Sequence, residues 1–282
     1  MSRNLTINEQ ASFDARVKQA YQGSGMLRHT VELADNIVGA THRFHKIGRG
    51  MATKRIDQTD VIPMNIMHGN ATAVIEDWNA AEYTGIFNQQ KVPYKEQDKL
   101  AYIIASAIGR REDQLILDAL DASATTNVVD TDVGGVGSGL NTAKMRRAKK
   151  MLDKVGVPRG KGERFFVISA DGLEELLGNT EVTSSDYNTV KALYDGEVSH
   201  WLGFEIIQME DRAEGGLPKT GNVRTSYAYH KQAAGLAVGI NFRTEVNYIP
   251  VKTSYLANGI FSGGAVAIDA EGIVEIETTE AA

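Results

Sequence analysis

Cysteine is absent from the 282 residues of this chain, and proline occurs only five times. Without cysteine the chain forms no disulfide, carries no thiolate nucleophile and builds no zinc site with sulfur ligands. The first ten residues lack an apolar core, and no later stretch approaches the roughly 18 apolar residues of a membrane span. These absences predict a soluble, cytoplasmic protein without a membrane partner.

Glycine, by contrast, is frequent, with 28 residues, which is somewhat above its typical share of about 7%. The apolar fraction of 42% is ordinary for a globular protein. At roughly 100 to 200 residues per domain, the length indicates one large or two modest domains. The sequence therefore predicts a chain with many bends and a substantial core.

Charge is distributed in blocks, although the net charge is only −6. Residues 41–55 and 144–164 are strongly basic, whereas the segment from Thr253 onward contains acids and no base. Such blocks give copies of the chain complementary surfaces, and solvated faces explain them equally well. Eight basic residues are candidates for contacts between subunits: Arg43, Lys46, Arg49, Lys54, Arg55, Arg146, Arg147 and Lys150.

Hydrophobic patterns predict the order of the elements. Residues 1–36 are polar and predict an arm with short helical pieces. Short β signals at Ile37-Val38, Val61-Ile62 and Thr72–Trp78 predict a long two-stranded excursion within residues 37–90.

Two helices follow. An apolar stripe predicts a long helix over Tyr94–Asp121, and Gly109 allows a bend in it. A second, basic helix is predicted to begin near Asn141, and a short helix over Leu173–Leu177 has Asp171 as its candidate cap.

Strands dominate the remainder of the chain, and regular βαβ alternation is lacking, so the predicted class is α+β. The predicted strands cover Phe165–Ser169, Phe204–Met209, Ser226–Tyr229, Ala234–Ile240, Thr244–Ile249, Ile260–Ile268 and Gly272–Ile276.

Motifs of nucleotide-binding and hydrolytic enzymes are present only as fragments. The glycine-rich run Gly134–Gly139 follows polar residues instead of a buried strand, and Gly156–Gly162 departs from phosphate-loop spacing. Lys219-Thr220-Gly221 matches one element of serine β-lactamases, but the sequence contains no Ser-x-x-Lys. We therefore predict no catalytic residue and no cofactor.

Metal and nucleic-acid sites are also poorly supported. His42 and His45 lie in a basic segment that repels a cation, so no metal site is predicted. The basic residues 144–150 could contact phosphates, but the acidic net charge and the lack of a base-reading module oppose dedicated DNA binding.

Taken together, the order of elements resembles that of tailed-bacteriophage major capsid proteins with the Hong Kong 97-like fold. The resemblance extends to seven segments along nearly the whole chain: Thr59–Asn65, Tyr83–Phe87, Ala107–Gln114, Phe166–Ser169, Leu193–Glu197, Gly203–Ile207 and Ala233–Gly239.

The resemblance implies an α+β fold with five regions: an N-terminal arm (1–36), an extended loop in the form of a β-hairpin (37–90), a peripheral domain with a spine helix (91–162), an axial domain (163–236) and return strands of the peripheral domain (237–282). It implies a structural protein that self-assembles as hexamers and pentamers into the icosahedral head around double-stranded DNA.

Further partners follow from the same resemblance. A separate scaffolding protein is expected because no fused scaffold segment is recognisable, together with a portal protein and, in some relatives, a cementing protein. DNA is enclosed without sequence-specific binding, and the protein is expected in the virion capsid after assembly in the host bacterial cytoplasm. Two alternatives stay open: an encapsulin-like compartment shell, and a nucleotide-binding enzyme built on the glycine-rich turns.

Overall fold

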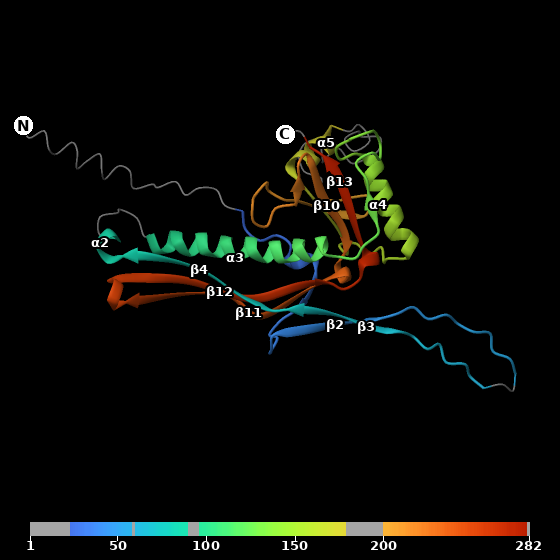
Figure 1. Ribbon diagram of the computed structural model, residues 1–282, viewed down its shortest axis with the longest axis horizontal. Coiled ribbons are helices and arrows are strands. Elements are labelled where there is room, and N and C mark those ends of the chain that lie inside the picture. The colour runs from blue at the N-terminus through green and yellow to red at the C-terminus, as the bar shows by residue number, and fades with distance from the viewer. Residues whose placement is uncertain (1–22, 58–59, 90–95, 179–199, 281–282) are drawn as a thin grey trace, which may run out of the picture.

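The computed structural model describes residues 23–57, 60–89, 96–178 and 200–280. Three expectations fall outside these ranges, wholly or in part: the beginning of the arm (1–22), the helix start near Pro93, and the segment Leu193–Glu197. Within them the chain has the predicted α+β class. An elongated sheet with a long helix along it carries a smaller lobe near one end (Figure 1).

The elongated sheet has four strands in the order β1-β11-β12-β4. β1 (Glu32–Ala34) runs parallel to β11 (Ala234–Ile249), whereas β12 (Ser254–Ala267) is antiparallel to β11 and to β4 (Glu76–Gly85). Two separate strands were predicted where β11 is continuous. Register shifts near Ile240 let one long strand pass through the region that looked like a break.

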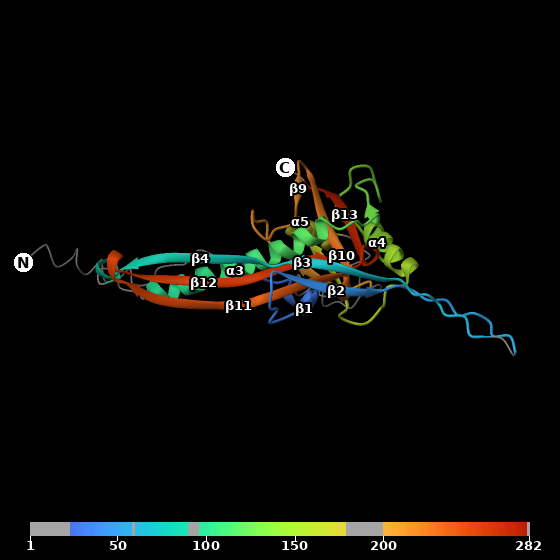
Figure 2. The same ribbon diagram turned by 60° about the horizontal axis from the view of Figure 1, so that its bottom comes forward.

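A separate hairpin extends beyond this sheet. β2 (Thr41–Ile47) pairs with β3 (His68–Val74), and the chain between them reaches away from the body (Figure 2). The predicted excursion is therefore present but shorter than residues 37–90, because β4 pairs with β12 in the elongated sheet. Ile37-Val38 and Val61-Ile62 were predicted as β segments, and neither lies in a strand.

The lobe is built on a seven-stranded sheet. Its main path is β5-β13-β10-β6-β8-β7, and β9 pairs with β10. The strands are β5 (Val128–Val129), β6 (Arg164–Ile168), β7 (His200–Trp201), β8 (Phe204–Gln208), β9 (Lys219–Thr220), β10 (Val223–His230) and β13 (Ile273–Thr279). The last strand of the chain thus lies beside β10, inside the lobe, although the return segment 237–282 was expected in the other unit.

Helices cover these sheets. They are α2 (Ile86–Gln89), α3 (Glu96–Asp121), α4 (Thr142–Val155) and α5 (Ala170–Leu177), with 3-10 turns η1 (Arg28–Thr30), η2 (Lys231–Ala233), η3 (Pro250–Lys252) and η4 (Ala270–Gly272). α3 has 26 residues and is about 39 Å long at 1.5 Å per residue. It lies along the elongated sheet, whereas α4, predicted in the same region as α3, packs on the lobe.

Two apolar clusters fill the lobe, one on each face of its sheet. On one face, Met145 and Leu152 of α4 pack with Phe166 of β6 and Val274 of β13. On the opposite face, Leu117 of the α3 end packs among Phe165, Val167, Tyr227 and Ile273. The alternation of strand residues between the two clusters follows from the two-residue period of a β-strand.

Caps fix the ends of the helices. The Asn141 side chain accepts a hydrogen bond from the Lys144 amide, as predicted for the start of α4. Ser169, and not Asp171, caps α5, because that helix begins at Ala170 and places Asp171 in its first turn. The Asp171 carboxylate is favourable there, near the positive end of the helix dipole.

Gly109 allows a close backbone approach and not the predicted bend. α3 is continuous through it. A Cβ on Gly109 would lie 2.6 Å from the Gly25 nitrogen. The described part of the predicted arm, residues 23–36, therefore crosses α3 at a pair of glycines instead of leaving the body, and larger side chains would separate the two backbones.

Among the described helices, none combines the length and the apolar character that a membrane crossing requires.

Gly264→Ala is expected to lower the free energy of unfolding by about 1–3 kcal/mol, because a Cβ there overpacks a fixed backbone. That Cβ would collide with the carbonyl oxygen of Val74, where the hairpin joins β4. Denaturant unfolding followed by the fluorescence of Trp78 and Trp201 measures the loss. Gly69→Ala, with nothing within 4 Å of the added Cβ, is the matched control. Equal stability of the two variants would contradict the close approach.

Candidate functional site

The eight predicted contact residues fall into three places. Arg43 and Lys46 are on β2, Arg49 follows that strand, and Lys54 and Arg55 are exposed in the loop between β2 and β3. The remaining three lie on exposed positions of α4: Arg146, Arg147 and Lys150. All eight were selected as surface charges, and each is exposed except Lys46, which is partly covered.

The two basic blocks meet in one groove, although about a hundred residues separate them in the sequence. The groove has a volume of about 420 Å³ and contains Arg49 together with Arg147 and Lys150. Its other lining residues are Asn127, Met151, Lys154, Val155 and Glu271. The side chains form a basic rim over a partly apolar floor, and Arg43, Lys54 and Arg55 do not line it.

Two of the predicted contact residues have acidic partners within the same chain. The Lys46 ammonium lies 2.7 Å from Asp269, and the Arg49 guanidinium lies 2.9 Å from Glu271. Both pairs join the base of the hairpin to the turn before β13. Because both are solvent-exposed, each contributes about 0–1 kcal/mol. These acids belong to the acidic C-terminal segment, which the sequence suggested for contacts with other copies.

The loop of the hairpin exposes apolar side chains together with Lys54 and Arg55. Met51 is 83% exposed, Val61 87% and Met67 83%. Several highly exposed apolar side chains in one loop are typical of an interaction site. The loop has its charged and apolar side chains available for another molecule.

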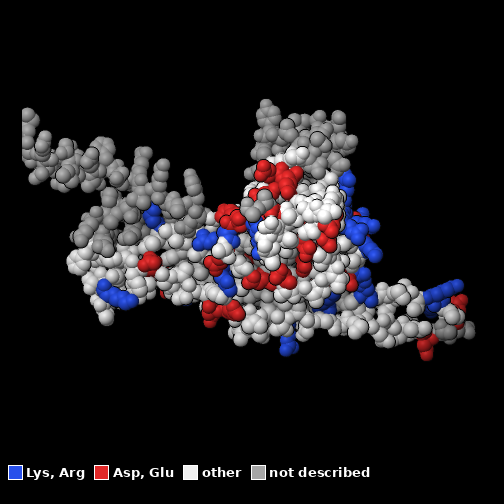
Figure 3. All heavy atoms as spheres, turned by 45° about the horizontal axis from the view of Figure 1, so that its top comes forward, with Lys and Arg blue, Asp and Glu red and all other residues white. Residues whose placement is uncertain are grey.

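An acidic face lies on the α3 side of the lobe. Asp118 and Asp121 occupy the end of α3, and Glu275 and Glu277 occupy β13. Figure 3 shows acidic side chains across one face of the lobe. Partial burial raises the pKa of Glu275, and repulsion from Asp121 and Glu277 raises it further. The sequence identified the acidic segment but not the contribution of α3, because the two sets of acids come together only through the sheet.

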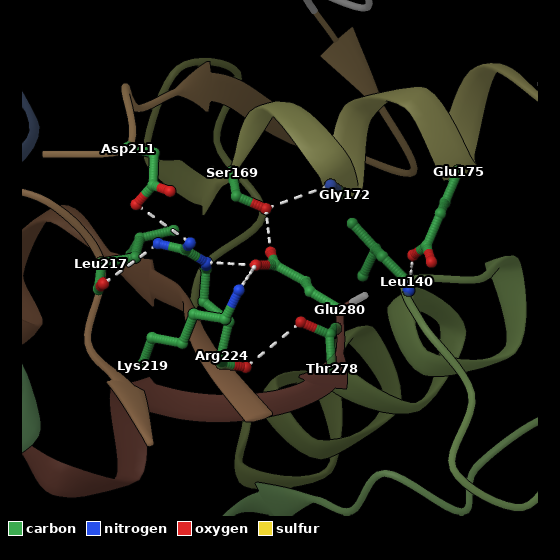
Figure 4. A network of polar contacts seen from close by, with 10 residues as sticks. All are labelled: Leu140, Ser169, Gly172, Glu175, Asp211, Leu217, Lys219, Arg224, Thr278 and Glu280. Carbon is green, nitrogen blue, oxygen red and sulfur yellow. Dashed lines mark hydrogen bonds and ion pairs between the residues drawn. The ribbon is translucent and has the colours of Figure 1, made fainter. Parts of the chain in front are cut away.

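A buried polar network ends the last strand (Figure 4). The Arg224 guanidinium lies 2.6 Å from Glu280 and 3.0 Å from Asp211, and Ser169 donates a hydrogen bond of 2.5 Å to Glu280. Lys219 is 3.5 Å from the same carboxylate. The sequence analysis missed this network. A charged residue within the otherwise buried strand β10 was the available signal.

Ser169 in this network has the geometry of a helix cap and not of an activated nucleophile. Its hydroxyl donates to the Glu280 carboxylate and accepts from the Gly172 amide. An adjoining cleft of about 450 Å³ is lined by Asp118, Asp121 and Asp211 together with Arg212, Lys219 and Arg224, among other residues. The three basic groups each have a carboxylate partner, and Asp118 and Asp121 accept hydrogen bonds from Gln114 and Tyr227, as in a structural anchor.

A second buried carboxylate fastens the N-terminal segment to α3. Asp113 accepts from the amides of Met26 at 3.0 Å and Leu27 at 2.9 Å, and Arg212 lies 2.9 Å away. Burial raises the pKa of Asp113, while the donors from Leu27, Met26 and Arg212 oppose that rise. The carboxylate thus joins three segments that are distant in the sequence.

The glycine-rich turn before α4 uses its backbone donors internally. The Gly137 amide donates to Asp132, the Ser138 amide to the Thr131 carbonyl, and the Leu140 amide to Glu175. The Lys144 ammonium lies 2.5 Å from the Ser138 carbonyl. A phosphate cradle needs free amides, so this turn favours a structural role over the nucleotide-binding alternative.

Metal ligands are likewise not assembled: no group of three or more His, Cys, Asp or Glu among the described residues could hold an ion. His42 instead packs edge-on against Phe44, with ring centroids 4.8 Å apart.

The sequence profile described as phage capsid protein matches residues 5–280. This chain belongs to the phage capsid protein family. Its role is structural, as part of the phage capsid. No curated protein matches the sequence.

Solved structures show the same fold at low sequence identity. The capsid structure of the Cyanophage P-SCSP1u has a TM-score of 0.74 at 14% identity, over 95% of this chain and 92% of that chain. The head structure of Helicobacter pylori bacteriophage KHP40 has a TM-score of 0.75 at 10% identity, over 95% of this chain and 94% of that chain. A Mycobacterium phage Che8 structure has a TM-score of 0.71 at 16% identity, over 93% of this chain and 94% of that chain. The Hong Kong 97-like fold implied by the sequence is confirmed.

Glu280→Ala is expected to destabilise this capsid protein by about 3–5 kcal/mol, because it leaves Arg224 buried without its principal partner. Denaturant unfolding of the purified chain gives the difference. Glu277→Ala is the matched control, since Glu277 lies on β13 shortly before Glu280 and is less buried, and we expect a change within about 0.5 kcal/mol. A similar small loss in both variants would show that the buried network is not a stabilising anchor.

Glu275→Gln is expected to stabilise the capsid protein at pH 7 by roughly 0.5 kcal/mol, because it removes repulsion between neighbouring acids. A raised folded-state pKa means that the native chain binds protons more readily than the unfolded chain. The contribution of the Glu275 side chain to the free energy of unfolding is therefore favourable below its ordinary pKa of 4.5. It is lost as the pH rises through the raised folded-state pKa. Unfolding curves between pH 4 and 7 should converge at low pH. Parallel curves would contradict the repulsion.

Proposed function

We propose that this chain is the major subunit of the icosahedral head of a tailed bacteriophage, where it self-assembles as hexamers and pentamers and encloses double-stranded DNA. The hairpin of β2 and β3 carries this proposal. Its loop projects from the body and exposes apolar side chains such as Met51, Val61 and Met67. The base of the hairpin packs on the body through Phe44 and Ala73, but a two-stranded hairpin beyond such support is marginal in water. Contact with a neighbouring subunit supplies the burial that the chain itself does not.

The regions have distinct roles in this proposal. β2, β3 and the loop between them form the extended loop; α3 and the elongated sheet form the peripheral domain; and the seven-stranded lobe forms the axial domain. This division moves β4 out of the extended loop, and it moves α4 and β13 into the axial domain, relative to the boundaries expected from the sequence.

The remaining partners follow from the same proposal. A separate scaffolding protein guides assembly in the host bacterial cytoplasm, a portal protein occupies one vertex, and a cementing protein is an optional addition. DNA is held without sequence-specific binding, which fits the net charge of −6 because phosphate contacts depend on basic groups.

Expression of the full chain with its scaffolding protein should yield closed particles in negative-stain electron microscopy. Monomers alone, by microscopy and light scattering, would refute the proposal. Particles that carry enzyme cargo and never package phage DNA would instead indicate the encapsulin-like alternative.

Reversal of Arg49 and Arg55 to Glu should reduce particle yield while the subunit stays folded. The Arg49 pair with Glu271 is exposed, so its loss costs at most about 1 kcal/mol in stability. Particle yield is measured by sedimentation and folding by circular dichroism. Normal particle yield from the folded double variant would exclude these charges as contacts between subunits.

A further inference from the structure

The exposed side of α4 is a basic stripe, defined here as Arg147, Lys150 and Lys154. The three residues follow one another at spacings of three and four, which places them on one side of a helix. In the described part of the chain none of them forms an ion pair. The acid that shares their groove, Glu271, already pairs with Arg49 at 2.9 Å.

A complementary surface lies on the other side of the same lobe. Asp118, Asp121, Glu275 and Glu277 form the acidic face, and no basic side chain pairs with them among the described residues. α4 packs against Val274 and Ile276. Because side chains alternate along β13, Glu275 and Glu277 point to the opposite side of the sheet.

The seven-stranded sheet therefore separates the two charged surfaces, and they cannot meet within one molecule. Basic side chains gather along the α4 edge of the lobe, and acidic ones lie across the face next to it (Figure 3). The hairpin loop extends on the α4 side as well (Figures 1 and 2). A neighbouring subunit held by the loop would consequently be brought beside the basic stripe.

We propose that the basic stripe of α4 docks on the acidic face of the next copy of the chain within a capsid ring. This inference rests on the proposed function, and it adds the surfaces that join successive subunits. A contact between two different surfaces of identical chains is heterologous, and repetition of it by a closing rotation produces a ring. Opposite charges on the two surfaces set the orientation and disfavour a two-fold pairing of like faces.

Charge reversal on either surface tests the contact. Arg147→Glu with Lys150→Glu reverses the stripe, which then has two acidic side chains and one basic side chain. Asp118→Lys, Glu275→Lys and Glu277→Lys together reverse the acidic face, which then has three basic side chains and one acidic side chain. We expect each of these two variants to remain folded and to lose about tenfold or more of its particle yield, because like charges then oppose each other. Lys161→Glu, at an exposed lysine outside the groove, is the control and should assemble as the unchanged chain does.

The chain with all five substitutions supplies the decisive result. Its stripe is acidic and its face is basic, so complementarity between successive copies returns, and particle yield should recover. If this chain does not fold, the two variants are mixed instead. Alternating copies are complementary, so six-membered rings should form, and pentamers, which cannot alternate, should not.

The outcomes separate the inference from the proposed function. Failure of the unchanged chain to form any particle refutes both. Normal particles from the folded stripe variant would overturn the docking contact alone. So would a folded five-substitution chain, or a mixture of the two variants, that does not recover particle yield. If the stripe variant forms normal rings that do not recruit the scaffolding protein, the stripe binds that partner instead. This result would also overturn the docking contact.

Discussion

Burial of the seven-stranded sheet on both faces is the constraint on which the rest of the molecule depends. One face is covered by α4 and α5. The other is covered by the end of α3 and by residues 27–31 of the predicted arm. The sheet is completed only when β13, from the end of the chain, enters beside β10. That strand is fixed by Glu280, which is buried against Arg224. Because covering elements occupy opposite faces, their outer charges also end on opposite sides, and a self-complementary subunit results.

The elements with strong local signals were predictable from the sequence. The apolar stripe of α3 and the start of α4 near Asn141 depend on residues that are close in sequence, and both helices are as expected. The pairing of β4 with β12 and of β13 with β10 depends on residues about 50 to 180 positions apart, which periodicity does not encode. Ser169 replaced the expected cap because its hydroxyl also meets Glu280 from the far end of the chain.

The candidate site shows the same division between local and distant information. Sequence blocks identified Arg49, Arg147 and Lys150 as surface cations, but only the fold places them in one groove. The partners of Lys46 and Arg49 were expected on other copies, and Asp269 and Glu271 of the same chain lie within ion-pair distance. The number of basic residues in a block shows how many cations could contact another copy. It does not show which of them pair with acids of their own chain.

This difference in neutralisation assigns separate roles to the two basic blocks. Near β13, Lys46 and Arg49 are held by acids of their own chain and so help to set the direction in which the hairpin leaves the body. Farther out, the loop carries exposed apolar side chains such as Met51 and Val61, whose burial depends on another molecule. Among the described residues, no acid forms an ion pair with the α4 stripe. A subunit without disulfides therefore combines two kinds of unsatisfied surface, apolar on the loop and charged on the lobe, and both face the side on which a neighbour would stand.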